Sequence, residues 1–190
     1  MSEFKKAYKK IMGYEGGYVN DPVDFGKETY KGISRKYNPN WSGWEIIDFY
    51  KSNSSFPKQL RDDAVLQEAV RSTYKKKYWD VFYGDRISNQ GLANKLFDIS
   101  VNLGAHRAVK FLQISLNVLN RDEALYKTIE ENGKMDNNTH TILEYSLTKD
   151  PETYILKILN ILQGTHYVKR VFDKSNQKRF IRGWLNRVNL

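Results

Sequence analysis

The sequence of 190 residues contains no cysteine. This absence excludes disulfide bonds, a catalytic thiol and thiolate ligands for a metal. Its three histidines, His106, His140 and His166, are far apart and lack the paired spacing that a zinc site requires. We therefore expect neither a metal nor any other cofactor.

Long apolar runs and several common catalytic motifs are also missing. No run of roughly 18 apolar residues is present, so we expect no membrane-spanning helix. The first residues, Met-Ser-Glu-Phe-Lys-Lys, have neither the apolar core nor the cleavage site of a signal peptide. A Gly-x-Ser-x-Gly elbow and a phosphate-binding loop are absent as well. These absences argue against a serine hydrolase of that type and against a P-loop nucleotidase.

The composition is that of a folded protein with an excess of positive charge. Hydrophobic residues make up 40% and aromatic residues 14% of the chain, which is enough for one globular domain or for two small lobes. Thirty-one basic and 22 acidic residues give a net charge of +9. Such a charge favours nucleic acid, anionic lipid or an anionic cell wall as a partner. Because no nucleic-acid-binding motif accompanies the charge, we do not expect a nucleic acid partner.

Apolar residues at helical spacing predict a mainly α-helical protein. The first helix is expected from Phe4 to Met12 and should end at Gly13. Further helices are expected over residues 44–51, 62–79, 91–103, 105–119, 122–131, 138–146, 151–174 and 176–188. In the helix over residues 62–79, the predicted buried side consists of Ala64, Val65, Ala69, Val70 and Tyr74. The helix over residues 91–103 is apolar nearly all round, so we expect it to be buried on most sides. The β-favouring pairs Tyr18-Val19 and Thr29-Tyr30 predict a short hairpin.

One stretch combines the residue types that glycoside hydrolysis needs. Glu15 follows the first helix, Asp24 comes nine positions later, and Thr29 follows after five more. An acid that protonates the leaving oxygen and a second carboxylate are the usual requirements of this reaction. Burial against a tyrosine such as Tyr18 would raise the pKa of Glu15 towards that of a general acid. Alternatively, Glu15 is a solvated surface charge and Asp24 bonds the backbone of its own turn.

These residues form part of a longer motif that resembles a known family. Glu-Gly-Gly-Tyr-Val-Asn-Asp-Pro-x-Asp-x-Gly, starting at Glu15, followed by Thr-x-x-Gly-Ile, starting at Thr29, is similar to glycoside hydrolase family 108. This family comprises N-acetylmuramidases of phage endolysins and secretion activator proteins. The likeness continues through segments 78–85, 96–104, 112–113 and 180–188. Lys27 replaces a glycine of the family motif, while Asn132 and Asp136 replace the aspartate and second glycine of Asp-Gly-x-x-Gly-x-x-Thr.

The resemblance implies a fold, a reaction and roles for individual residues. The fold would be mainly α and lysozyme-like, with a small β-hairpin beside the active-site cleft. Residues 1–90 would form a catalytic lobe, and residues 91–190 would form a helical, peptidoglycan-binding-like lobe packed against it. The enzyme would cleave the β-1,4 bond between N-acetylmuramic acid and N-acetylglucosamine in peptidoglycan. Glu15 would be the general acid, Asp24 would activate water or stabilise positive charge, and Thr29 would orient the water.

Four further residues are expected to bind substrate. Tyr18 and Tyr30 lie on the two predicted strands. Asn102 shares a helix face with Asp98, so these two residues either bond to each other inside the core or contact sugar. Trp184 lies four residues after Phe180, a spacing that places both rings on the core side or leaves Trp184 free to stack on a sugar ring.

The resemblance also implies where the protein acts and with which partners. Its partner would be the glycan strands of peptidoglycan, in the periplasm or the cell wall. A protein made in the cytoplasm without a signal peptide would need an export partner or a holin to get there. The main alternative is a non-catalytic cell-wall-binding or secretion-accessory protein that has kept the fold.

Overall fold

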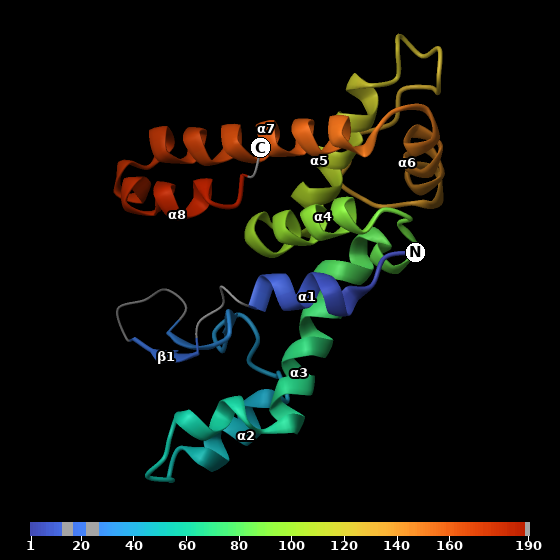
Figure 1. Ribbon diagram of the computed structural model, residues 1–190. Helices are drawn as coiled ribbons and strands as arrows, with labels where there is room; N and C mark the ends of the chain where they lie inside the picture. Colours follow the sequence, from blue (N-terminus) through green and yellow to red (C-terminus); the bar gives the residue numbers. More distant parts are fainter. Residues whose placement is uncertain (13–16, 22–26, 189–190) are drawn as a thin grey trace. The chain divides into compact units, whose positions relative to one another are not determined.

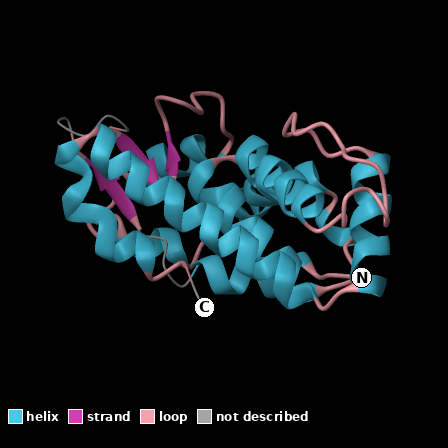
Figure 2. Ribbon diagram, turned by 90° about the horizontal axis from the view of Figure 1, so that it is seen from above, coloured by secondary structure: helices cyan, strands magenta, loops and turns pink. Residues whose placement is uncertain are grey.

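The structure is a computed structural model that describes residues 1–12, 17–21 and 27–188 (Figure 1). Helices dominate the described residues, and a small antiparallel sheet is the other regular element, as Figure 2 shows. This confirms the predicted mainly α-helical class with a small hairpin. The elements are α1 Phe4–Met12, β1 Tyr18–Asn20, β2 Glu28–Tyr30, β3 Ile33–Ser34, α2 Gly43–Tyr50, η1 Lys58–Arg61, α3 Ala64–Tyr74, η2 Lys75–Trp79, η3 Asp80–Phe82, η4 Gly84–Arg86, α4 Gln90–Leu103, α5 Ala105–Val118, α6 Asn137–Lys149, α7 Glu152–Asp173, η5 Ser175–Phe180 and α8 Ile181–Leu185.

The chain divides into two compact units. The sheet unit consists of Tyr8–Lys76 and contains the strands, α2 and α3. The helical unit consists of Met1–Ala7 and Lys77–Leu190 and contains α4 to α8. The boundaries between the units therefore fall within α1 and within η2. The predicted division into a catalytic lobe and a peptidoglycan-binding lobe at residue 90 concerns function, and it stays a prediction.

The sheet unit is built around a three-stranded antiparallel sheet in the order β1-β2-β3. β1 pairs with β2 in the register Val19 to Thr29, and Tyr30 of β2 pairs with Ile33 of β3. The turn between β2 and β3 has two residues of positive φ, Lys31 at 43° and Gly32 at 75°. This is the conformation of the tight turns that match the twist of a hairpin, and glycine favours it. The turn adds a third strand to the predicted hairpin.

Helix α3 buries Val70 and Tyr74 of the predicted side, but not Ala64, Val65 or Ala69. Its N-cap is Asp63, whose carboxylate accepts a hydrogen bond of 2.7 Å from the Leu66 amide. Leu66, Val70 and Tyr74, spaced four residues apart, form the buried side. The prediction that Val65 is buried is wrong, because Val65 lies about 100° around the helix from Leu66 and is 70% exposed.

The helical unit is organised around α4, which packs against α5 and α7. Its side chains Leu92, Leu96, Phe97 and Ile99 are fully buried, which confirms the prediction of a helix buried on most sides. The Asn89 side chain caps α4 by accepting a hydrogen bond of 2.9 Å from the Leu92 amide. In the part of the chain that the structure describes, no helix has the length and apolar character needed to cross a membrane.

The predicted helix over residues 122–131 is wrong, because residues 119–136 contain no helix. Three consecutive residues, Arg121, Asp122 and Glu123, have positive φ angles, which a right-handed helix excludes. The Asn117 side chain is hydrogen-bonded to the later part of this loop, at Ile129. Its amide nitrogen donates to the Ile129 carbonyl at 2.9 Å, and its oxygen accepts from the Ile129 amide at 3.0 Å. These bonds replace the backbone bonds that a helix would make.

The single helix predicted over residues 176–188 is also wrong. The chain instead forms the 3₁₀ helix η5 and then the short helix α8. Asn176 and Gly183 have lower helix propensity than alanine, so the sequence supports only short helical pieces here. Neither Phe180 nor Trp184 is fully buried, and Phe180 is 42% exposed.

Candidate active site

Two of the three predicted catalytic residues, Glu15 and Asp24, lie outside the described residues. Their roles therefore stay predictions. In the chain, the segment with Glu15 directly precedes β1, and the segment with Asp24 connects β1 to β2. The described part of the candidate site is accordingly the sheet and the side chains that support it.

Thr29, the third predicted catalytic residue, occupies the middle of β2. Side chains alternate along a strand, and the flanking residues Glu28 and Tyr30 are both buried while Thr29 is half-buried. Its neighbours on the adjacent strands are Val19 and Ser34. Val19 is 50% exposed. Thr29 thus belongs to the more open face of the sheet.

The two predicted substrate-binding tyrosines differ in exposure. Tyr18 is half-buried, its hydroxyl donates to Glu28 at 3.0 Å, and its ring meets Phe56 edge to face at 4.7 Å. Tyr30 is only 2% exposed, and its hydroxyl donates to the Leu60 carbonyl at 3.0 Å. We assign Tyr30 a structural role in the core of the sheet unit. Direct contact of either tyrosine with substrate stays a prediction.

An ionic network supports the sheet on the face opposite to Thr29. The buried Glu28 carboxylate forms salt bridges with Arg35, at 2.6 Å, and with Lys51, at 2.8 Å. Both cations also bind Asp48 of α2, Lys51 at 2.7 Å and Arg35 through both of its terminal nitrogens. The Arg35 guanidinium stacks over the Trp44 ring at 4.9 Å. The network ties β2 to α2 and fixes the backbone that carries Thr29.

The network keeps both of its carboxylates ionised. Burial opposes ionisation of Glu28, but hydrogen bonds from Lys51, Arg35 and Tyr18 outweigh it and lower the pKa of Glu28. Hydrogen bonding by Arg35 lowers the pKa of Asp48 to about 2. Burial and the bond to Glu28 raise the pKa of Tyr18, so its hydroxyl keeps its proton. Glu28 is therefore a fixed anion, unlike the titrating acid that the reaction requires.

Sequence reasoning did not find this network. The available signal was the alternation of side chains along Glu28-Thr29-Tyr30. This alternation places Glu28 on the same face of the strand as Tyr30, which indicates that Glu28 is buried. A buried carboxylate needs cationic partners. Their identity could not be read from the sequence, because Arg35 and Lys51 come from different elements.

Asn102, predicted to bind sugar, lies on α4 of the helical unit. Its amide donates to Asp98, to the backbone carbonyl at 2.7 Å and to the carboxylate at 3.0 Å. The two side chains thus bond to each other, as the first alternative expected, but both are half-buried and lie outside the core. The Asp98 carboxylate also accepts a hydrogen bond of 3.0 Å from the Gln163 amide and forms a salt bridge of 3.1 Å with Arg187. A role of Asn102 in sugar binding stays a prediction.

Trp184, on α8, is half-buried within an aromatic stack. Its ring is nearly parallel to that of Tyr167, at 5.3 Å and 26°, and to that of Phe180, at 6.0 Å and 26°. The Arg170 guanidinium lies 5.4 Å from the Trp184 ring centre. These neighbours engage the ring within the helical unit, and its stacking on a sugar stays a prediction.

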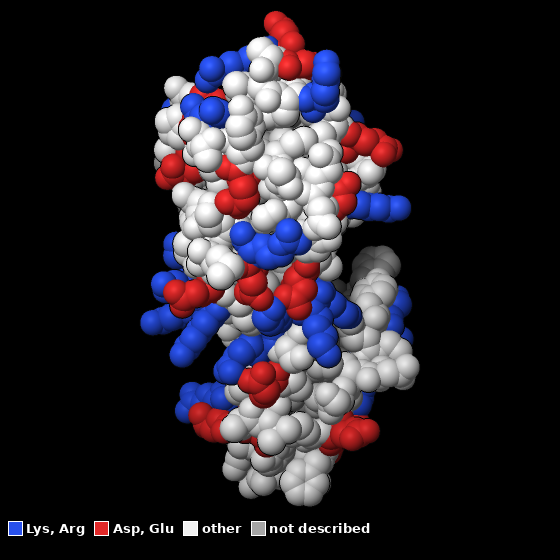
Figure 3. Space-filling view, turned by 90° about the vertical axis from the view of Figure 1, so that its right-hand side faces the viewer, with Lys and Arg blue, Asp and Glu red and all other residues white. Residues whose placement is uncertain are grey.

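The electrostatic surface is mixed. On the face shown in Figure 3, Lys and Arg side chains lie among Asp and Glu side chains instead of forming an unbroken basic surface. Across the described ranges, no group of three or more histidine or acidic residues is arranged to hold a metal ion.

Comparison with known proteins identifies the family. The model described as "Glycosyl hydrolase 108" matches residues 8–104, which is more than half of the chain. The chain belongs to glycoside hydrolase family 108. A second model, described as "Predicted Peptidoglycan domain", matches residues 107–189. Membership of family 108 and the peptidoglycan region confirm the resemblance seen in the sequence.

A solved structure supports the fold of this family 108 protein. The chain is similar to the structure of SagA from Brucella abortus, with a TM-score of 0.62 and 22% sequence identity. The match covers 97% of this chain and 88% of that chain. At this identity the likeness shows the fold alone. A comparison with curated proteins found no significant match.

Proposed function

We propose that this family 108 protein is an N-acetylmuramidase of the lysozyme type. It cleaves the β-1,4 bond between N-acetylmuramic acid and N-acetylglucosamine in peptidoglycan. The observation that carries the proposal is the family 108 match over residues 8–104, joined in one chain to a peptidoglycan region over residues 107–189. A glycosidase that carries a wall-binding region acts on the glycan of that wall.

In this mechanism Glu15 donates a proton to the leaving oxygen, and Asp24 holds water or stabilises the oxocarbenium-like transition state. Thr29 orients the water. The described structure supports the last role through the position of Thr29 on the more open face of β2. The network around Glu28 on the opposite face holds that strand in place. Positioning of this kind raises the rate without a cofactor.

The proposed substrate places the activity in the periplasm or the cell wall. We propose that an export partner or a holin brings the protein to this substrate, and that cleavage serves cell lysis or secretion through the wall. The net charge of +9 favours association with wall polymers that carry carboxylates and phosphodiesters.

Digestion of purified peptidoglycan by the wild type and by Glu15→Gln tests the proposal. The wild type is expected to release fragments with muramic acid at the reducing end, as measured by mass spectrometry. Glu15→Gln should lose at least about a hundredfold of this activity, because it has no proton to donate. Glu45→Gln, at an exposed position in α2, is the matched control and should stay active.

Three outcomes would contradict the proposal. Equal activity of the wild type and Glu15→Gln would remove Glu15 from the mechanism. Glucosamine at the reducing ends would show a different bond specificity. If neither protein releases fragments while both still bind to cell walls, the non-catalytic accessory protein is the better description.

A further inference from the structure

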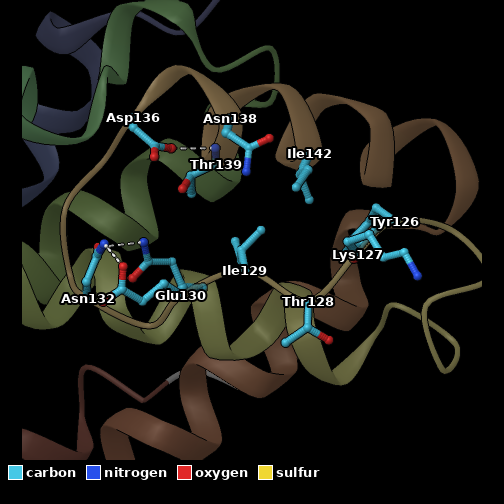
Figure 4. A pocket seen from close by; sticks show the side chains of 11 residues that line it. Tyr126, Lys127, Thr128, Ile129, Glu130, Asn132, Asp136, Asn138, Thr139 and Ile142 are labelled. Atoms are coloured by element: carbon cyan, nitrogen blue, oxygen red, sulfur yellow. Dashed lines mark hydrogen bonds between the residues drawn. The ribbon is translucent and has the colours of Figure 1, made fainter.

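The helical unit contains a pocket that none of the candidate site residues lines. It has a volume of about 440 Å³ and lies between α5, α6 and the loop over residues 119–136 (Figure 4). We call it the loop pocket. Its lining residues are Gln113, Tyr126, Lys127, Thr128, Ile129, Glu130, Asn132, Asp136, Asn138, Thr139 and Ile142.

The loop pocket combines an apolar part with a polar part. Figure 4 shows Tyr126 and Ile142 on one side, Glu130, Asn132 and Asp136 on the other, and Ile129 between them. The apolar part suits a methyl or methylene group. The carboxylates and amides suit a ligand that offers hydrogen-bond donors. Small-molecule sites commonly show this mixture of apolar walls and a few oriented polar groups.

The polar wall is held rigidly in place. Gln113 is 1% exposed, and its amide accepts from the Gly133 nitrogen at 2.8 Å and donates to the Lys134 carbonyl at 3.1 Å. The same amide nitrogen donates to Asn132 at 3.2 Å. Asn132 in turn donates to one oxygen of Glu130 at 3.0 Å. The Glu130 carboxylate is therefore oriented by a chain of bonds that begins at a buried amide.

The charge of this wall is negative in a protein whose net charge is +9. Among the described residues, no lysine, arginine or histidine forms a salt bridge with Glu130 or Asp136. Lys127 pairs instead with Glu123 at 2.8 Å, and its nitrogen points away from the pocket in Figure 4. A cation from a ligand would thus meet a carboxylate that forms no salt bridge with the described residues of the protein.

We infer that the loop pocket binds the peptide part of peptidoglycan, with the free ammonium group of a diamino acid against Glu130. This inference rests on the proposed function, since it takes peptidoglycan as the substrate. The amide of Asn138 and the hydroxyl of Thr128 can bond the peptide backbone, and the apolar part accepts an alanine methyl group. An ammonium group that has been used in a cross-link carries no charge, so the pocket selects peptides that are not cross-linked.

Binding of a synthetic peptide by the full-length chain tests the inference. The probe is Ala-γ-Glu-Lys, compared with the same peptide acetylated on the lysine amine, by isothermal titration calorimetry. Glu15→Gln is used as the background, so that hydrolysis plays no part. We expect the free amine to bind about tenfold more tightly than the acetylated one, because a charge-assisted hydrogen bond is lost on acetylation.

Variants of two adjacent residues, Glu130 and Glu131, distinguish binding in the loop pocket from a general effect of negative charge. Glu130→Gln should abolish the preference for the free amine. Glu131→Gln is the matched control and should keep it, since the Glu131 carboxylate binds Asn117 at 3.1 Å and does not line the pocket. Both positions are exposed, and circular dichroism checks that both variants fold.

Equal affinity for the two peptides would overturn the inference, as would a preference that survives in Glu130→Gln. Binding of a disaccharide of N-acetylated sugars in the loop pocket, with no binding of peptide, would also overturn it. These outcomes differ from a failure of the proposed function, which would appear as absent muramic acid ends in the digestion assay. A protein without hydrolytic activity that still prefers the free amine would support the inference for a wall-binding protein.

Discussion

Arg35 donates a hydrogen bond of 2.6 Å to the carboxylate of Glu28, which is 8% exposed. Because Glu28 immediately precedes Thr29 on β2, this pair holds the strand from one face while Thr29 occupies the other. The ion pair thus links the stability of the sheet unit to the geometry of the candidate active site.

Substitution of Glu28 should destabilise the protein. In Glu28→Gln the cations Arg35 and Lys51 lose a buried anion, and we expect the free energy of unfolding to fall by about 1 to 3 kcal/mol. Urea unfolding followed by circular dichroism measures the change. Glu68→Gln breaks an exposed ion pair with Arg71 and should cost about 0.5 kcal/mol or less. Equal costs for the two variants would show that burial adds nothing at Glu28.

The same network predicts a dependence of stability on acid pH. The pKa of Asp48 is lowered from 3.8 to about 2, so its contribution to stability is fully present above pH 3.8 and is lost as the pH falls towards 2. The difference in unfolding free energy between the wild type and Asp48→Asn should therefore shrink from pH 5 to pH 2. Asp62→Asn, which removes an exposed carboxylate outside the network, is the control for the loss of one charge. A constant difference over this range would contradict the assigned shift.

Helices were predicted well from the sequence where the spacing of apolar residues is enough to determine the structure. The first helix, from Phe4 to Met12, has the predicted bounds, and α4 is buried as expected. The sequence failed over residues 119–136, where Asn117 bonds a backbone segment that is remote in sequence. Periodicity carries no information about such bonds. The candidate site shows the same limit, because the motif identified Thr29 but not the partners of its neighbour Glu28.

At alkaline pH, Lys95 should control part of the stability of the helical unit. Its ammonium donates to Gln163 at 2.6 Å and to the Arg187 carbonyl at 2.9 Å. Burial lowers the pKa of Lys95 from 10.5 to about 8, although Asp98 opposes this shift. Between pH 8 and 10.5 the unfolded chain binds more protons at this residue than the folded one, so stability should rise with pH.

Lys95→Met removes this titration. Relative to the variant, the wild type should gain unfolding free energy as the pH rises from 8 to 10, measured by urea unfolding at each pH. Lys110→Met, at an exposed position on α5, provides the control for the loss of one lysine. A wild type that shows no gain relative to Lys95→Met would mean that the pKa of Lys95 is not lowered in solution.

A glycine in the loop over residues 119–136 should resist substitution. Gly133 has a φ angle of 68°, and a Cβ there would lie 2.7 Å from both the ring and the backbone oxygen of His106. Gly133→Ala should therefore lower the unfolding free energy by more than about 1 kcal/mol. Gly183, within α8, has no atom within 4 Å of an added Cβ, so Gly183→Ala should be neutral or stabilising. Thermal unfolding of both variants measures the difference in stability. Similar melting temperatures for the two variants would contradict the expected strain of an alanine at position 133.

Substitution of Thr29 separates its chemical role from its structural role. Thr29→Val keeps the shape and removes the hydroxyl, so the proposed water loses a partner, and peptidoglycan hydrolysis should fall at least about tenfold. Thr29→Ser keeps the hydroxyl and should retain most of the activity. Val19→Ala changes the cross-strand neighbour of Thr29 and serves as a control for disturbance of the sheet.

The turnover of soluble glycan fragments is the most informative measurement for these variants. A loss in kcat for Thr29→Val with an unchanged melting temperature, together with recovery in Thr29→Ser, would establish that the hydroxyl acts in the reaction. Full activity of Thr29→Val would remove Thr29 from the mechanism and would leave water orientation to Asp24 alone. A parallel loss of activity and melting temperature in both Thr29→Val and Val19→Ala would make Thr29 a structural residue of the sheet.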